Sequence, residues 1–225
     1  MSSESGRSEI RTAAPSLPEP PLAEGLEPLI HLWPGGDPLL RCHDSRFGAT
    51  EFNPGLGAGR FHPLANAAGE SIPTLYGSAT FQGALSETVF HDVPFRGANR
   101  RLRQAGLLPL VVSTLAAGRD LRLAQLHGHG LRRLQVSRGE LIEVEAADDP
   151  RTRRWAEALH RCGARPDGLV WVSRLHDTSL AVVLFGDRVA REELEVVEAP
   201  LPLAWGPGLE KVRQAAEAAD ILLTI

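Results

Sequence analysis

The sequence contains little cysteine and no long apolar run. Its two cysteines, Cys42 and Cys162, form no CxxC pair, so they fit a reducing compartment and exclude a disulfide framework. No apolar stretch approaches the roughly 18 residues that a membrane-spanning helix needs. The first ten residues, MSSESGRSEI, lack the apolar region of a secretion signal. We therefore expect a cytoplasmic protein with no membrane partner.

An excess of positive charge is also missing. The net charge of −4 offers no basic footprint for nucleic acid, so we expect no direct nucleic-acid binding. Lys211 is the single lysine, and the remaining cationic side chains are arginines. This skew fits a GC-rich genome, but arginine also binds phosphate in a bidentate manner. The length of 225 residues, with 43% hydrophobic and 23% charged residues, fits one globular domain.

Common catalytic motifs are absent as well. The chain has neither a GxSxG nucleophile elbow nor a GxxxxGK[ST] phosphate loop. The stretch GLGAGRF lacks the spacing of a dinucleotide fingerprint, and the FHP that follows cannot open the required helix. The stretch HGHG has two histidines but no third ligand at zinc-site spacing, so we expect a solvated turn and no metal site.

The chain divides into a tail and one domain. Residues 1–28 are rich in Ser, Pro, Glu and Gly and predict a flexible, disordered N-terminal tail. Residues 29–225 show no internal repeat and no second linker, so we expect a single domain there. Within it, residues 44–73 predict a long irregular segment, and segments of this length are usually functional.

Helices and strands alternate along the domain. The patterns predict strands in TLYGSA, LLPLVVSTL and LRLAQL, and a helix in FQGALSETVFHDV. DDPRTRRWAEALHRCG predicts a helix with Asp149 as its N-cap and Gly163 at its C′ position. GLVWVSR and SLAVVLFG predict an antiparallel strand pair, and GLEKVRQAAEAADILL predicts a final helix. The fold class is α+β.

Four polar residues lie in unusual surroundings. Arg60 follows three glycines, and Tyr76, the only tyrosine, precedes three small residues. Glu87 lies among apolar helix positions, and Ser173 ends a strand. A guanidinium, a ring, a carboxylate and a hydroxyl suit a nucleotide-glycosidic site, where they would bind diphosphate, stack on a base and stabilise an oxocarbenium-like centre. Each residue also has an ordinary structural explanation: a surface arginine, a core tyrosine, a solvent-facing glutamate or a strand-end serine.

The order of these residues resembles the RES domain, the toxin half of a bacterial toxin–antitoxin system that is named for an arginine, a glutamate and a serine. The resemblance covers residues from about 37 to 190. Six short motifs carry it: LLRC with Arg41, GRFHP with Arg60, TLYGSA with Tyr76, GALSETVF with Glu87, DGLVWVSR with Ser173, and SLAVVLF ending at Phe185. The turn departs from the family's usual Arg-Trp-Asn because Phe61 and His62 follow Arg60.

The resemblance implies a fold similar to that of ADP-ribosyltransferases, a mixed sheet flanked by helices. It implies an NAD+-degrading toxin that cleaves the nicotinamide–ribose bond by phosphorolysis or hydrolysis, with NAD+ as substrate, phosphate as an optional co-substrate and no tightly bound cofactor. An Xre-type helix-turn-helix antitoxin would block the pocket, and a homodimer is compatible with it. The alternatives are a protein ADP-ribosyltransferase with the same site and an inactive RES-like binding module, which the altered turn favours.

The resemblance also implies roles for individual residues. Arg60 would hold the phosphates, and Tyr76 would pack against the nicotinamide end. Glu87 would stabilise the ribosyl cation or orient the nucleophile. Ser173 and Arg41 would complete the NAD+-binding set.

Overall fold

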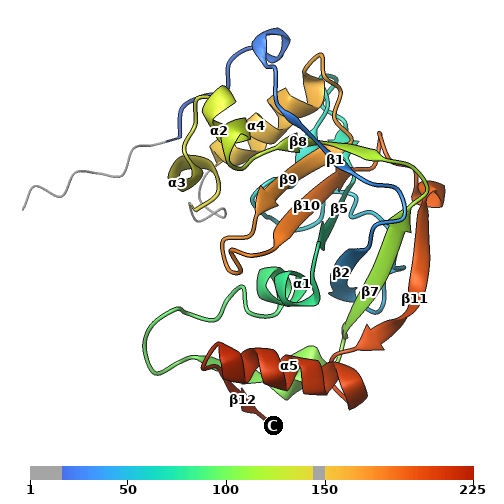
Figure 1. Ribbon diagram of the computed structural model, residues 1–225, viewed down its shortest axis with the longest axis vertical. Helices are drawn as coiled ribbons and strands as arrows, with labels where there is room; N and C mark the ends of the chain where they lie inside the picture. Colours follow the sequence, from blue (N-terminus) through green and yellow to red (C-terminus); the bar gives the residue numbers. More distant parts are fainter. Residues whose placement is uncertain (1–16, 144–149) are drawn as a thin grey trace, which may run out of the picture.

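The protein folds around one eight-stranded mixed sheet (Figure 1). The computed structural model describes residues 17–143 and 150–225. The strands are β1 (Ile30–Trp33), β2 (Leu39–Asp44), β3 (Leu64–Ala65), β4 (Ser71–Ile72), β5 (Thr74–Ser78), β6 (Arg101–Arg103), β7 (Leu110–Ala117), β8 (Leu121–Gln125), β9 (Gly168–Val172), β10 (Leu180–Phe185), β11 (Leu194–Pro202) and β12 (Leu222–Thr224). The large sheet has the order β1-β8-β9-β10-β5-β2-β7-β11.

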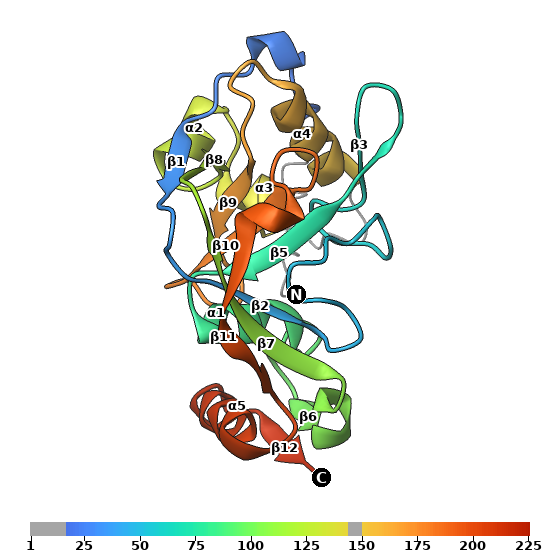
Figure 2. The ribbon, with the colours of Figure 1, turned by 90° about the vertical axis from the view of Figure 1, so that its right-hand side faces the viewer.

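The sheet narrows in its middle. Only β8 and β9 pair in parallel, and the other neighbours in this sheet are antiparallel. Strands β5 and β2 meet at one position, where Leu40 is opposite Ser78. Figure 2 shows how strongly the sheet twists between its two ends. Because these strands pair over so short a length, their side chains can line a cavity beside the junction.

The helices pack at the two ends of the sheet and beside its middle. They are α1 (Phe81–Thr88), α2 (His129–Arg133), α3 (Arg138–Leu141), α4 (Pro150–Arg161) and α5 (Gly206–Ala218), with short 3₁₀ turns at Ala23–Gly25, Gln104–Leu107 and Arg191–Glu193. Helices α2, α3 and α4 lie at the β8–β9–β10 end, and α5 lies at the opposite end of the molecule, with α1 between them (Figure 1).

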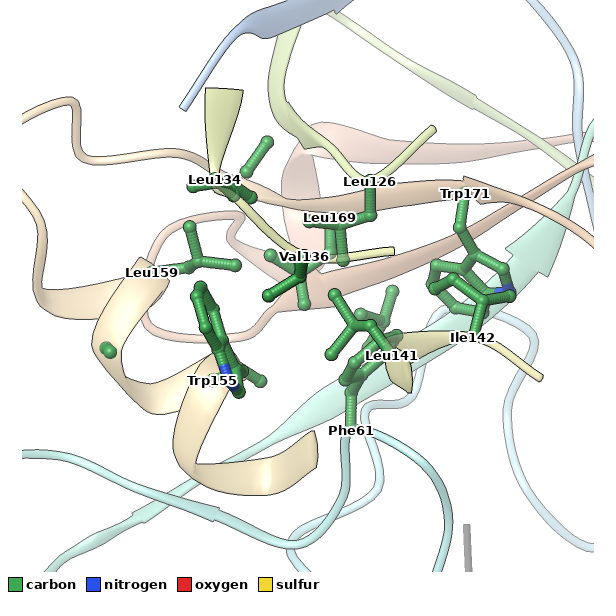
Figure 3. Close-up of a cluster of buried hydrophobic side chains, with 14 of the residues drawn as sticks. Phe61, Leu126, Leu134, Val136, Leu141, Ile142, Trp155, Leu159, Leu169 and Trp171 are labelled. Atoms are coloured by element: carbon green, nitrogen blue, oxygen red, sulfur yellow. The ribbon is translucent and has the colours of Figure 1, made fainter. Parts of the chain in front are cut away.

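The core on the α4 side is built from aromatic and branched side chains. Trp155 on α4 is 1% exposed, and it packs with Leu159, Leu169 and Trp171 in one cluster (Figure 3). Alternation along β9 sends Leu169 and Trp171 to this cluster and Val170 to a second one on the other face. Strand β9 is therefore covered on both faces.

Most predicted elements are confirmed, and the fold is the expected α+β class with a large mixed sheet flanked by helices. TLYGSA forms β5, LLPLVVSTL forms β7, LRLAQL forms β8, and the predicted antiparallel pair is β9 with β10. The final helix differs, because it ends at Ala218 and the apolar end of the chain forms β12, which pairs in parallel with β6.

The ends of α4 differ in part from the sequence prediction. Asp149, the predicted N-cap, lies outside the described residues. The predicted C′ role of Gly163 is wrong, because the residue after α4 with a positive φ is Arg165, at 45°. The amide N–H of Arg165 donates to the carbonyl of Cys162, so a turn outside the helix reverses the chain.

Residues 17–28 differ from the predicted flexible tail. Leu17 and Leu26 are buried, and the Trp155 Nε1–H donates to the carbonyl of Pro18 at 2.8 Å. Glu19 also pairs with Arg154 at 2.6 Å. The composition suggested a tail because these apolar residues are few, but α4 supplies the surface that buries them. The domain boundary at residue 29 stays a prediction.

None of the helices in the described ranges is long and apolar enough to span a bilayer. Within the same ranges, no group of three or more His, Cys, Asp or Glu side chains could hold a metal ion.

Candidate active site

The position of Glu87 is set by the tight junction between β5 and α1. Thr80 caps α1, and its hydroxyl accepts the Gly83 N–H at 3.0 Å. A Cβ atom at Gly83 would lie 2.2 Å from Ser78 Oγ and 2.3 Å from Ser179 Oγ. Only glycine therefore permits α1 to approach β5 and β10 this closely, and this approach brings Glu87, near the end of α1, over the sheet.

Glu87 lies in a cavity of about 880 Å³ beside the junction of β2 and β5. The walls come from β2, β5, α1, the loop after α1, the turn before Phe61 and the end of β9. The lining residues are Leu40, Cys42, Ala58, Gly59, Arg60, Tyr76, Gly77, Ser78, Ala84, Glu87, Thr88, His91, Asp92, Val93, Pro94, Phe95, Trp171, Arg174, Leu175 and Ala181. A cavity of this size is large enough for a nucleotide.

Ser173 contacts Glu87 directly. Its hydroxyl donates to Glu87 Oε1 at 2.5 Å and accepts the N–H groups of Leu175 and His176 at 3.1 and 3.0 Å. Ser173 is fully buried and is not one of the residues that line the cavity. It therefore orients the carboxylate of Glu87. The sequence prediction that Ser173 contacts the ligand would require its hydroxyl to face the cavity, and the structure does not place it there.

Tyr76 forms part of an aromatic wall. Its hydroxyl accepts the Phe61 N–H at 3.2 Å, and its ring meets Trp171 edge to face, with centroids 6.1 Å apart. The ring of Phe61 also meets Trp171 edge to face, with centroids 5.2 Å apart (Figure 3). Burial raises the pKa of the Tyr76 hydroxyl above its ordinary value. Tyr76 is therefore suited to shaping the wall and holding the turn, and less to proton transfer.

Arg60 brings a positive charge to the same cavity. Its Nη1 donates to the Leu141 carbonyl at 3.1 Å, and its own carbonyl accepts from Thr152 Oγ1 at 2.6 Å. Burial, followed by the charge of Arg174, lowers the pKa of Arg60 to about 10, so the guanidinium is still charged at neutral pH. Among the described residues, no carboxylate forms an ion pair with it.

Arg41 lies on the face of β2 that is turned away from the cavity. Its predicted place in the NAD+-binding set is therefore not supported by the structure. Its Nη1 donates to the carbonyls of Ala49 and Glu51 at 2.7 and 2.6 Å. Its neighbours Leu40 and Cys42 line the cavity, and alternation along β2 directs Arg41 away from it. The sequence motif identified the strand correctly, but Arg41 stabilises the loop at residues 48–51.

Two further residues were not predicted. Trp171 follows from the inward alternation of GLVWV, which could have revealed it. Arg138 on α3 donates to the carbonyls of Val172 and Ser173, both at 3.1 Å, and so fixes the end of β9. No local pattern connects Arg138 with Ser173, because 35 residues separate them.

The altered turn after Arg60 has a structural explanation. Phe61 is fully buried in the aromatic cluster, and His62 Nδ1 contacts Thr74 Oγ1 at 2.9 Å. His62 Nε2 lies 2.8 Å from the Leu56 carbonyl. These side chains hold the turn against β5, so the departure from Arg-Trp-Asn leaves Arg60 at the cavity.

Comparison with known proteins relates this arrangement to one family and one solved fold. A family model described as "RES domain" matches residues 38–206. A chain from the crystal structure of the M. tuberculosis MbcT–MbcA toxin–antitoxin complex has a similar fold, with a TM-score of 0.55 and 13% sequence identity, covering 83% of this chain and 92% of that chain. Identity this low shows a shared fold only. Among curated proteins, none gives a significant sequence match.

Proposed function

The chain belongs to the RES domain family, and from this premise we propose that it is a toxin that consumes NAD+ by cleaving the nicotinamide–ribose N-glycosidic bond. The observation that carries the proposal is the pairing of Glu87 with Ser173 at a cavity that also holds Arg60 and an aromatic wall. A fixed carboxylate, a cation and an aromatic wall are the groups that a reaction of this kind needs.

Glu87 stabilises the charge that develops on the ribose. As the C1′–N bond breaks, its electron pair leaves on nicotinamide and positive charge grows on C1′ and the ring oxygen. The carboxylate of Glu87, held by the 2.5 Å bond from Ser173, faces that charge without reorganising. An oxygen of phosphate or of water then forms the new bond to C1′, and a water nucleophile releases its proton to solvent.

The other cavity residues orient the substrate. Arg60 binds the diphosphate through the donors of its guanidinium that Leu141 does not use. Tyr76 and Trp171 present an aromatic wall to the nicotinamide end. Because the Tyr76 hydroxyl already accepts the Phe61 N–H, the contribution of Tyr76 comes from its ring.

A protein antitoxin is the proposed partner. The similar solved fold comes from a toxin–antitoxin complex, and the family resemblance suggests an antitoxin of the Xre helix-turn-helix type that covers the cavity. Co-purification with the product of an adjacent gene, and loss of NAD+ turnover in the complex, would support this proposal.

The test of the reaction is release of nicotinamide from NAD+ by the purified protein, with and without phosphate. We expect release in at least one condition and a loss of roughly 100-fold or more in Glu87→Gln, which keeps the shape and removes the charge. Glu217→Gln, an exposed position on α5, is the matched control and should leave the rate unchanged. Equal rates in Glu87→Gln and the wild-type protein would contradict the mechanism.

Labelled NAD+ separates the acceptors. Label in an ADP-ribose phosphate with the phosphate on C1′ indicates phosphorolysis, and label in ADP-ribose indicates hydrolysis. Label that remains on protein indicates a protein ADP-ribosyltransferase with the same site. NAD+ binding without any nicotinamide release indicates a binding module and overturns the proposed reaction.

A further inference from the structure

Arg174 lies in the cavity without a partner for its charge. It follows Ser173 directly, is half-buried and lines the same cavity as Glu87. Across residues 17–143 and 150–225, its side chain forms no hydrogen bond and no ion pair. A half-buried arginine that nothing in the fold neutralises is available to a ligand.

The backbone at Arg174 is fixed. Ser173 Oγ accepts the N–H groups of Leu175 and His176, so the turn closes around the serine hydroxyl with Arg174 at its corner. Arg138 holds the Val172 and Ser173 carbonyls from the other side. The hydroxyl that orients Glu87 thus also anchors the residue next to Arg174.

Two positive charges meet in this cavity. Arg60 and Arg174 both line it, and after burial the charge of Arg174 is the largest cause that lowers the pKa of Arg60. Glu87 is the carboxylate that acts on Arg60, and it already accepts the Ser173 hydroxyl. Asp92 also lines the cavity, but its side chain is 97% exposed and contacts His91. Of the two carboxylates that line the cavity, Glu87 alone is partly buried, so the two guanidinium groups share one partly buried carboxylate.

We propose that Arg174 and Arg60 form a two-arginine subsite for a phosphoryl group beside Glu87. Paired guanidinium groups bind phosphoryl oxygens in bidentate fashion, and a doubly charged anion neutralises both. The inference rests on the proposed function and extends it to Arg174, a residue to which the family resemblance assigned no role. The phosphoryl group has two sources, the diphosphate of NAD+ and an inorganic phosphate that acts as the acceptor.

Either source gives a balanced reaction. With inorganic phosphate, one of its oxygens forms the C1′–O bond while the electron pair of the C1′–N bond leaves on nicotinamide. No oxidant or reductant is needed. With the NAD+ diphosphate in the subsite, Arg174 takes no part in bond formation and orients the substrate so that C1′ lies at Glu87.

The experiment compares Arg174→Met, Arg174→Lys and the control Arg213→Met, an exposed position on α5. Steady-state nicotinamide release is measured over a matrix of NAD+ and phosphate concentrations and again without phosphate. We expect Arg174→Met to raise one KM by about tenfold or more, with partial rescue in Arg174→Lys. Arg213→Met should match the wild-type protein.

The pattern identifies the source of the phosphoryl group. A rise in the KM for NAD+, present also without phosphate, assigns the subsite to the diphosphate. A rise in the KM for phosphate, with hydrolysis unchanged, assigns it to the acceptor. Both constants within twofold of wild type, in a variant that unfolds like wild type, would overturn the inference.

Calorimetric titration with ADP-ribose and with inorganic phosphate keeps the inference separate from the proposed function. If the wild-type protein releases no nicotinamide but binds either probe, and Arg174→Met weakens that binding tenfold, the subsite stands and the proposed reaction falls. If Arg174→Met and the wild-type protein bind both probes equally, or neither protein binds a probe, the subsite is wrong.

Discussion

The arginines of two regions differ in how their charge is paired within the described residues: Arg119 after β7 is bound by carboxylates, and Arg60 and Arg174 in the cavity are not. At the end of β7, Arg119 donates to both oxygens of Asp167 at 2.9 and 3.0 Å and to Glu193 at 2.6 Å. These carboxylates raise the pKa of Arg119 above its ordinary value, with the Asp167 hydrogen bonds as the largest cause. In the cavity, burial and Arg174 lower the pKa of Arg60 to about 10.

The difference separates structural from functional charge. The donors of Arg119 bind Asp167, Glu193 and the Arg188 carbonyl, so its side chain ties these segments together. Arg60 and Arg174 line one cavity, with Glu87 as the one carboxylate that acts on Arg60, and the repulsion between the two charges costs stability. A fold keeps such an arrangement when a ligand completes it, and the clearest signal of the site is therefore the imbalance of charge.

The largest expected effect is at Arg60. Arg60→Met should reduce nicotinamide release by about 100- to 1,000-fold because the diphosphate loses its cation. The unfolding midpoint should change little, since the side chain makes one hydrogen bond, to the Leu141 carbonyl. Nicotinamide release and thermal unfolding on the same preparation check both statements. A stable Arg60→Met variant with normal turnover would contradict the functional role of Arg60, and with it the difference from Arg119.

Arg119→Met should give the opposite result. Losing its bonds to Asp167 and Glu193 should lower the free energy of unfolding by roughly 2 kcal/mol, because the 11% exposed Asp167 side chain keeps a charge without its partner. Turnover per folded molecule should stay within twofold of wild type. Urea unfolding measures the first quantity, and Arg213→Met serves as control. An unchanged unfolding free energy would contradict a structural role.

Ser173→Ala sharpens the assignment of Ser173 as a positioning residue. Without the hydroxyl, Glu87 loses its 2.5 Å hydrogen bond and its fixed orientation. We expect kcat to fall about tenfold while the KM for NAD+ changes less than threefold. Ser45→Ala, at an exposed turn, is the control. A rise in KM with normal kcat would instead indicate that Ser173 contacts the ligand.

The smallest effect is expected where residues 17–28 pack against the buried Trp155 on α4. Trp155→Phe removes the N–H that donates to the Pro18 carbonyl and should lower the unfolding free energy by about 1 kcal/mol. Thr152 on the same helix donates to the Arg60 carbonyl. Turnover therefore shows whether the loss of the Trp155 hydrogen bond changes the position of Arg60. We expect turnover within twofold of wild type, and a larger fall would show that residues 17–28 help to position Arg60.

Local pattern predicted the elements that position the site. The strand with Tyr76, the helix with Glu87 and the strand before Ser173 all form as expected, because alternation and capping act within a few residues. The first of these strands does not end at Tyr76 but continues to Ser78. Side-chain direction was harder to predict. Arg41 was assigned to the site from its motif, but one residue of alternation along β2 turns it to the opposite face.

Contacts between distant segments lay beyond sequence reasoning. Ser173 donates to Glu87, which lies 86 residues away in the sequence. Because Ser173 is fully buried, it orients the carboxylate of Glu87 and does not contact a ligand. Arg138 and Trp171 join the site through packing of α3 against β9. The composition of residues 17–28 predicted a tail because they contain few apolar side chains. These side chains are buried only by contacts with α4, which is distant in the sequence.

Binding of NAD+ to Glu87→Gln tests the central claim most directly, because slow turnover permits an equilibrium measurement by calorimetry. The account predicts saturable binding by Glu87→Gln, binding weakened by at least tenfold when Arg60→Met is added, and unchanged binding when Arg119→Met is added. Absence of NAD+ binding, or equal weakening by both arginine substitutions, would contradict it.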